Sequence, residues 1–206
     1  MQKELLKIAL PVNLECSINE EIIEIVSNLK PHRATLVPER REEVTTEGGL
    51  DVIKNKEKIK RAIEKLKSND IEVSLFIDPD FEQIKASKEI GASMIELHTG
   101  KYANLFLALN TNINHTPFKV YENLDRKTLK KELEIELNLL KDASKLGVDL
   151  DLEVAAGHGL NYQNVLEIVK IKEIKELNIG HSIIANAVFV GLFEAVKKMK
   201  TIIETA

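Results

Sequence analysis

The stretch that decides the fold is residues 72–98, EVSLFIDPDFEQIKASKEIGASMIELH. Its pattern predicts a strand over 72–78, a helix that Asp80 opens and Gly91 closes, and a second strand over 93–98. A strand, a helix and another strand in immediate succession are typical of a parallel sheet covered by helices.

The same alternation runs through the rest of the chain. Further short apolar runs predict strands over 11–15, 33–38, 150–156 and 177–180. The amphipathic stretches between them predict helices whose expected ends are Asn19 or Ser17, Pro31, Asp125, Gly147 and Asn161. A last helix is expected from 181 to about 204, with its apolar side packed on a sheet.

Two architectures fit this pattern, a doubly wound open sheet and a (β/α)8 barrel. A barrel typically needs about 250 residues, so 206 residues with six strands favour the open sheet. However, residues 5–9 resemble the end of a helix that leads straight into the first strand, as if the chain began inside a βα unit. The pattern alone therefore leaves both architectures open.

The composition excludes several classes of protein. The chain has 33 acidic and 29 basic residues, a net charge of −4, and 44% hydrophobic residues, which excludes disordered, collagen-like and membrane-spanning proteins. Basic and acidic residues are interspersed, so we expect neither nucleic acid nor a membrane surface as a partner. A single cysteine, Cys16, and the lack of a secretory signal favour a cytoplasmic location.

Polar residues follow every predicted strand. Ligands bind at the carboxyl ends of parallel strands in both architectures. A turn or a helix cap is the simpler explanation for any one strand, but all six together favour a shared site. These residues are Glu15, Pro38 to Arg40, Asp78, Glu96 to Gly100, Gly157 to Gly159, and Gly180 with His181.

Two of these strand ends are the most specific. His158 lies between two glycines directly after an apolar strand, which favours a general acid or base over a structural histidine. Gly180 and His181 begin the last predicted helix, where free backbone N–H groups attract a phosphate. A glycine turn with a capping histidine explains that second position equally well.

The acidic strand ends and the loops have weaker signals. Glu15 and Glu96 can be carboxylates tuned as bases in a partly dry pocket, or partners of Arg40 in a buried ion pair. The loop from Thr45 to Gly49 suits a substrate clamp or a plain turn. The polar insertion over 101–124 is predicted to be a lid or an interface loop.

The sequence contains none of the common nucleotide or metal motifs. A Walker A loop, G-x-G-x-x-G, H-E-x-x-H and C-x-x-C are all absent, and the five histidines lie on separate segments, so we expect no metal. No predicted strand ends in lysine, which argues against a Schiff base with the protein.

Six motifs together resemble one family. They are VNLE (12–15), LVPERREEVTTEGGLDV (36–52), VSLFID (73–78), IELHTG (95–100), AAGHGLNY (155–162) and ELNIGHSII (176–184). The set resembles the pyridoxine 5′-phosphate synthase family of vitamin B6 biosynthesis. The resemblance implies an α/β fold, a TIM (β/α)8-type barrel with about six of its eight βα units present, and a single domain over 1–206.

The resemblance also implies an activity. A transferase-type synthase of this family condenses 1-deoxy-D-xylulose 5-phosphate with 3-amino-2-oxopropyl phosphate to pyridoxine 5′-phosphate, inorganic phosphate and water, with neither a metal nor an organic cofactor. By motif, Glu15 resembles the catalytic base, His158 the catalytic acid and Glu96 the carboxylate that stabilises the transition state. Substrate contacts are implied for Thr45, Gly159, Gly180 and His181.

The sequence departs from the family at its beginning. Family members start with two further strands that carry V-N-I-D-H and H-x-R-E-D-R-R-H motifs, and neither motif occurs in this chain. We therefore expect greatly reduced or no turnover from the chain alone. Two alternatives stay open: a shortened, non-catalytic phosphate-binding or assembly subunit of the same family, whose members form homo-octamers, and an unrelated phosphate-utilising enzyme with a doubly wound sheet.

Overall fold

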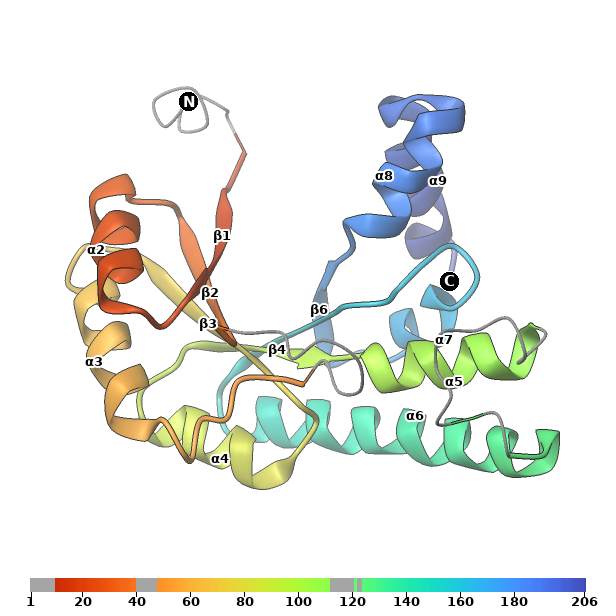
Figure 1. The fold of residues 1–206 in the computed structure, drawn as a ribbon, viewed down its shortest axis with the longest axis horizontal. Helices are drawn as coiled ribbons and strands as arrows, with labels where there is room; N and C mark the ends of the chain where they lie inside the picture. The colour runs from red at the N-terminus through yellow and green to blue at the C-terminus, as the bar shows by residue number, and fades with distance from the viewer. Residues whose placement is uncertain (1–9, 40–47, 112–120, 122–123) are drawn as a thin grey trace. The chain divides into compact units, whose positions relative to one another are not determined.

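The structure, a computed structural model, describes residues 10–39, 48–111, 121 and 124–206. In these residues strands and helices alternate along the chain (Figure 1). The strands are β1 (Asn13–Ser17), β2 (Arg33–Val37), β3 (Glu72–Ile77), β4 (Met94–His98), β5 (Glu153–Gly157) and β6 (Ile174–Asn178). The helices are α2 (Glu20–Leu29), α3 (Lys56–Lys67), α4 (Phe81–Glu89), α5 (Gly100–Asn110), α6 (Arg126–Asp149), α7 (Val165–Val169), α8 (His181–Val190) and α9 (Leu192–Glu204).

The order of the strands decides between the two architectures. The six strands pair in the order β1-β2-β3-β4-β5-β6, and the pairings from β1 to β4 are parallel. A doubly wound sheet reverses its strand order at a switch point, whereas a (β/α)8 barrel keeps its strands in chain order. The fold is therefore α/β of the (β/α)8-barrel type, with six strands in the described residues, as the resemblance predicted.

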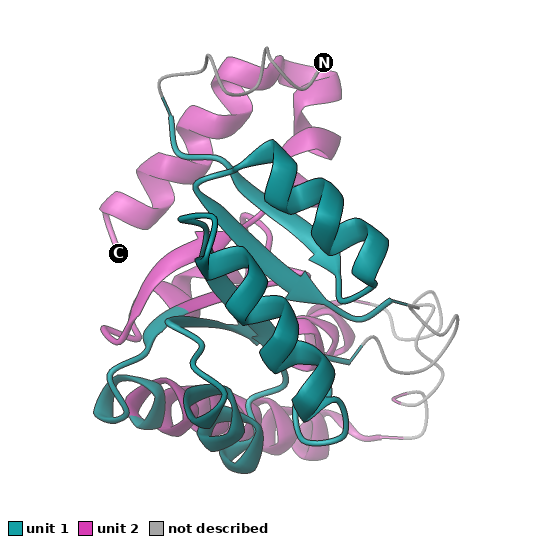
Figure 2. Cartoon of the chain, turned by 90° about the vertical axis from the view of Figure 1, so that its left-hand side faces the viewer, with its two compact units in different colours: residues 1–97, 146–154 teal, residues 98–145, 155–206 magenta. Residues whose placement is uncertain are grey.

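The chain divides into two compact units (Figure 2). Unit 1 consists of residues 1–97 and 146–154, and unit 2 of residues 98–145 and 155–206. Each unit combines separate stretches of sequence, and a single domain over 1–206 stays a prediction.

In unit 1 the two faces of the sheet differ in polarity. One face carries apolar side chains that are buried apart from the half-buried Leu14, among them Cys16, Ala34, Leu36, Val73, Leu75, Ile77, Ile95 and Leu97. The other face carries Glu15, Thr35, Ser74 and Glu96 at alternate positions. Because these strands carry polar side chains on their second face, that face is available for a polar site.

The helix starts of unit 1 follow the sequence. Asn19 Oδ1 accepts the N–H of Glu21 at 2.9 Å and so begins α2. Asp80 Oδ1 accepts the N–H groups of Glu82 and Gln83, both at 2.9 Å, and begins α4. Both caps were predicted, since these side chains satisfy N–H groups that have no partner inside the helix.

Gly147 was predicted to end α6, and this prediction is wrong. The helix continues to Asp149. A Cβ on Gly147 would lie 2.8 Å from Val154 Cγ2 and 3.1 Å from Ile95 Cδ1. The glycine is needed because the helix packs closely on these side chains, and not because the chain turns there.

In unit 2, α5 and α6 share a small apolar core. Leu105, Ala108 and Leu129 are buried together. Asp125 Oδ1 accepts the N–H of Thr128 at 2.7 Å, which confirms Asp125 as the start of α6. Residues 101–110 of the predicted lid or interface insertion belong to α5. Residues 112–120 and 122–123 lie outside the described residues, so the role of the insertion stays a prediction.

The predicted last helix is two helices. The chain breaks at Gly191, which has φ +83° and closes α8 before α9 begins. The expected packing of the apolar side is wrong for α8, which buries none of its residues and leaves Phe189 86% exposed, whereas α9 buries Ala195 and Met199. The strand predicted over 177–180 lies earlier, at Ile174–Asn178, and its start was missed because Lys175 and Glu176 interrupt the apolar pattern.

Candidate active site

The end of β5 holds His158 in an unusual backbone conformation. Gly157 is the last residue of the strand, His158 has φ +79° and Gly159 has φ +74°. A histidine with positive φ costs free energy and persists only where its surroundings hold it. His158 is half-buried. The sequence predicted a functional histidine here, and the structure adds that its backbone is strained.

The residues at the end of β4 lie against this loop, within unit 2. The imidazole of His98, which is 6% exposed, lies with its centroid 5.0 Å from that of His158, and the two rings are tilted by 58°. Thr99 Oγ1 lies 2.7 Å from the carbonyl oxygen of Gly157 and 2.6 Å from that of His158. His158 is therefore contacted by two consecutive residues that precede α5.

Other hydrogen bonds fix the remainder of the loop. The side chain of Asn164 accepts the N–H of Asn161 at 2.7 Å and donates to the carbonyl of Gly159 at 3.1 Å. The hydroxyl of Tyr102 in α5 donates to the carbonyl of Asn164 at 2.7 Å. Asn161 was predicted to cap α7, but its side chain caps the turn before that helix, through the N–H of Gln163 at 2.8 Å.

The N-terminus of α8 adjoins the same loop. The hydroxyl of Ser182 donates to the carbonyl of Leu160 at 2.8 Å, which joins the first turn of α8 to the loop that carries His158. Gly180 is the residue before the helix, and no side chain caps the helix there. A Cβ on Gly180 would meet no atom within 4 Å, so the space beside these N–H groups is open. Unit 2 thus brings together four of the predicted residues: His158, Gly159, Gly180 and His181.

The two predicted carboxylates belong to unit 1. Glu15 in β1 is opposite Thr35, and Thr35 is opposite Ser74. Glu96 in β4 is opposite Phe76, two residues further along β3. Since paired and alternate residues share a face, Glu15 and Glu96 point to the same side of the sheet. Glu96 is 3% exposed, whereas Glu15 is exposed.

Comparisons with known proteins agree with this architecture. The sequence profile of the family described as "Pyridoxal phosphate biosynthesis protein PdxJ" matches residues 3–205. A "Pyridoxine 5'-phosphate synthase" of Nautilia profundicola is 75% identical over 194 residues, which are 94% of this chain and 75% of that protein. The chain belongs to the PdxJ family.

Other relatives extend the same result. Proteins named "Pyridoxine 5'-phosphate synthase" from Nitratiruptor sp. and Campylobacter fetus are each 58% identical, over 96% and 95% of this chain and 75% and 76% of their own lengths. Among solved structures, a mandelate oxidase variant has a TM-score of 0.54 at 11% identity, covering 98% of this chain and 59% of its own. That last likeness concerns the fold alone.

Several predicted features of the PdxJ site fall outside the described residues. Thr45 and Arg40 lie in the segment 40–47, so neither the substrate contact nor the alternative ion pair is tested. The end of the same loop is described. There, Asp78 Oδ1 accepts the N–H of Gly49 at 3.0 Å, and a Cβ on Gly49 would lie 2.3 Å from the backbone nitrogen of Asp78. Only a glycine fits this close approach to the end of β3.

Two other ionisable groups are neutral at physiological pH. Burial raises the pKa of the Cys16 thiol to about 11. Burial also raises the pKa of Tyr102 to about 12, with a smaller effect from Glu167. Neither the Cys16 thiol nor the Tyr102 phenol is therefore ionised near pH 7.

The described residues lack both a metal-binding cluster and a membrane-spanning helix. They contain no cluster of three or more His, Cys, Asp or Glu side chains that could hold a metal ion. In the same part of the chain, no helix is both long enough and apolar enough to cross a membrane.

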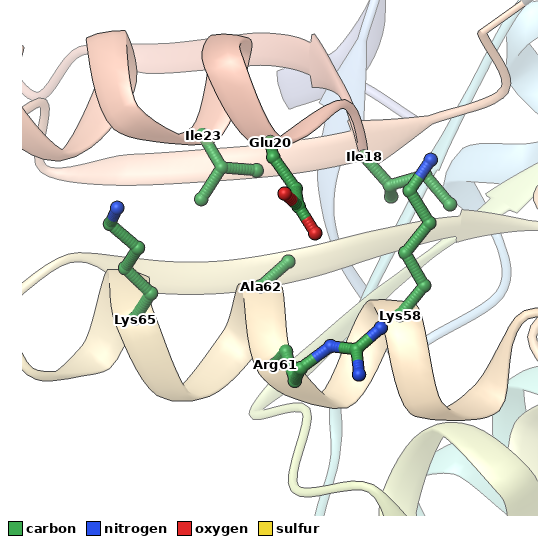
Figure 3. Close-up of a pocket in the computed structure, with 7 residues that line it drawn as sticks. All are labelled: Ile18, Glu20, Ile23, Lys58, Arg61, Ala62 and Lys65. Carbon is green, nitrogen blue, oxygen red and sulfur yellow. The ribbon is translucent and has the colours of Figure 1, made fainter.

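A hollow lies in unit 1, between α2 and α3 (Figure 3). Its volume is about 180 Å³, and its lining includes three cations and one carboxylate. Figure 3 shows Glu20 directed between the two helices, with Lys58 and Arg61 on the α3 side. Lys65 forms an ion pair with Glu24. The hollow contains none of the predicted site residues, although Ile18 in its lining directly follows β1.

Sequence reasoning missed the contacts of His98, Thr99 and Asn164. His98 and Thr99 belong to the quoted IELHTG motif, but a single sequence does not show that the end of β4 contacts a loop about sixty residues away. Two polar residues between a strand and a glycine were the available signal. Pairing of β4 with β5 in the sheet is what turns this signal into a contact.

Proposed function

We propose that this PdxJ protein condenses 1-deoxy-D-xylulose 5-phosphate with 3-amino-2-oxopropyl phosphate to give pyridoxine 5′-phosphate, inorganic phosphate and water. The family and the names of its relatives support the synthase activity, and the substrates follow from the resemblance of the six motifs. One observation carries the proposal, namely the hydrogen bond from Ser182 to Leu160 that joins the α8 N-terminus to the His158 loop.

The chemistry needs proton transfers at several steps. Forming a pyridine ring from an amino ketone phosphate and a keto sugar phosphate requires imine formation, loss of two water molecules, elimination of one phosphate group as inorganic phosphate, and a ring closure. His158 serves as the acid that protonates leaving hydroxyl groups, and Glu15 serves as the base that removes protons from carbon and nitrogen. Glu96 stabilises positive charge that develops in the transition state, since a buried carboxylate interacts strongly with a nearby cation.

The phosphate groups position the substrates. Free N–H groups at the start of α8, with the helix dipole, favour a phosphate beside Gly180 and His181. The exposed backbone of Gly159 lets a substrate approach, and the glycine itself is needed because a Cβ there would lie 2.7 Å from Ala103 Cβ. Thr45 contacts 1-deoxy-D-xylulose 5-phosphate. A phosphate held beside the His158 loop gives the acid a fixed geometry relative to the reacting atoms.

Mass spectrometry of the reaction tests the proposal. We expect the purified chain, mixed with both substrates, to form pyridoxine 5′-phosphate at a greatly reduced rate that still exceeds a blank without protein. His158→Ala should reduce this rate by about 10²-fold or more, because an acid of this kind typically contributes 10²- to 10⁴-fold. Glu15→Gln should have a similar effect. Glu153→Gln is the matched control, since Glu153 is an exposed strand carboxylate at the opposite end of β5 from His158.

Two results would contradict the proposal. A His158→Ala variant with unchanged turnover would remove His158 from the acid role. A wild-type chain that forms no product would favour the non-catalytic phosphate-binding or assembly subunit. The homo-octameric assembly that the resemblance implies and the cytoplasmic location that the sequence favours stay predictions, and size-exclusion chromatography with light scattering would check the first.

A further inference from the structure

Three consecutive residues, between the end of β4 and the start of α5, lie on one side of His158. His98 contacts its ring, Thr99 contacts its carbonyl, and Gly100 lies beside both rings. We propose that His98, Thr99 and Gly100 form a bracket that sets the backbone conformation of His158 and the direction of its imidazole. The inference rests on the proposed acid role of His158 and assigns these three as positioning residues.

Thr99 holds the backbone of the loop. Its N–H already donates to the carbonyl of Gly157 at 2.8 Å, so the hydroxyl is available for the carbonyl of His158, 2.6 Å away. That carbonyl belongs to the peptide plane between His158 and Gly159, both of which have positive φ. A hydrogen bond to this plane favours the strained conformation over the extended one that a histidine would otherwise adopt.

Gly100 and His98 restrict the ring. A Cβ on Gly100 would lie 2.5 Å from His98 Nε2 and 3.2 Å from His158 Cδ2. Both imidazoles therefore pack over the glycine, in space that any other residue would fill. His98 is buried at the end of a strand, so its ring is a fixed surface against which His158 rests.

The rest of the loop is already fixed by other contacts. Asn164 bonds Gly159 and Asn161, and Tyr102 bonds Asn164, so these two side chains hold residues 159–164. The bracket adds contacts to the carbonyl and to the ring of His158 itself. An acid that is oriented before the substrate binds loses little freedom in the reaction, which is why misplacement by about 1 Å can cost about 10²-fold in rate.

Substitution of Thr99 tests the bracket. Thr99→Val keeps the volume and removes the hydroxyl, and Thr99→Ser restores the hydroxyl. Thr111→Val is the matched control. The hydroxyl of Thr111, like that of Thr99, donates to a backbone carbonyl, at 2.7 Å from Leu107 O, but Thr111 lies at the other end of α5. Histidine ring NMR spectra of this chain, assigned with His158→Ala, report the state of the His158 ring without requiring turnover.

We expect wild type, Thr99→Ser and Thr111→Val to show one sharp set of His158 ring resonances, and Thr99→Val to show shifted and broadened or doubled ones. In the synthase assay, Thr99→Val should lower kcat by about 10²-fold with little change in KM, and Thr99→Ser should recover most of the rate. If Thr99→Val does not fold, His98→Ala replaces it, with the same expected change in the spectrum.

Unchanged His158 resonances in a folded Thr99→Val or His98→Ala variant would overturn the bracket. This outcome differs from failure of the proposed function, which would appear as full turnover in His158→Ala. If His158→Ala is active but Thr99→Val still disturbs the His158 ring, the bracket is correct and the acid role is wrong. If His158→Ala is inactive but the ring is undisturbed in Thr99→Val, the acid role holds and the bracket fails.

Discussion

The N-termini of α4 and α8 differ in whether a side chain accepts their first backbone N–H groups. At α4, one carboxylate oxygen of Asp80 accepts two backbone N–H groups. At α8, the preceding residue is Gly180, and no side chain accepts the first N–H groups. A helix start that its own side chain has satisfied has no free donors for an anion, whereas an open start has them.

An open start alone does not make a site. Of the described helices, α3, α5, α7 and α9 also begin without a side-chain cap. The residue before α5, Thr99, also bonds the loop of His158, but Thr99 is fully buried. What distinguishes α8 is that it combines the hydrogen bond from Ser182 to that loop with a preceding glycine, Gly180, whose Cβ position is open. The sequence therefore leaves an open, uncapped helix start beside its candidate acid, whereas Asp80 caps α4.

Closing the α8 N-terminus should have the largest effect. We expect Gly180→Asp to weaken binding of inorganic phosphate by at least about tenfold, because a carboxylate there takes the N–H groups and repels the anion. Gly180→Asn should weaken binding less, since it caps without charge. Isothermal titration calorimetry with phosphate measures both. Equal affinity in wild type and Gly180→Asp would show that phosphate binds elsewhere.

Opening the α4 N-terminus should change stability and not binding. Asp80→Ala removes the acceptor of two N–H groups and should lower the free energy of unfolding by about 1 kcal/mol. Asp80→Asn keeps an acceptor and serves as the control, with a smaller loss. Urea denaturation measures the difference. A loss of phosphate affinity in Asp80→Ala would instead mean that the two helix starts are not independent.

The third helix start, at α6, should show the smallest effect, visible only as a dependence on pH. The backbone N–H of Thr128 holds the pKa of Asp125 below its ordinary value. A carboxylate with a lowered pKa in the folded state contributes stability above its unfolded pKa of about 3.9, and this contribution is lost as the pH falls through the folded pKa.

We therefore expect wild type to lose thermal stability relative to Asp125→Asn as the pH falls from about 5 to about 3, because asparagine caps without titrating. Melting temperatures of both proteins over this range check the prediction. Curves that stay parallel would mean that the charge of Asp125 does not contribute to the stability of α6.

Most of the helices and strands could be predicted from the sequence, since local signals determine where they begin and end. The side chains of Asn19, Asp80 and Asp125 cap their helices as predicted, because capping needs only a short polar residue at the right spacing. The role of Gly147 was wrongly predicted and the helix break at Gly191 was missed, both for one reason. A glycine signals a turn, a break or a close approach equally well, and only tertiary packing distinguishes them.

The candidate site was predictable as a set of strand ends but not as a set of contacts. His158 could be identified because a histidine between two glycines is rare after an apolar strand. The contacts of Thr99 and Ser182 could not, since each joins residues that are distant in sequence and depends on the order of the strands. Strand order itself, which excludes the doubly wound sheet, is likewise a property of long-range pairing.

The most direct measurement of the central claim is a titration of the isotope-labelled chain with inorganic phosphate, followed through its backbone amide and histidine ring resonances. The account predicts saturable shifts of the His181, Ser182 and Ile183 amides together with the His158 ring, and no such shifts in Gly180→Asp. Saturable shifts of amide resonances confined to the hollow between α2 and α3, around Lys58 and Arg61, with the resonances of α8 and His158 unchanged, would contradict it.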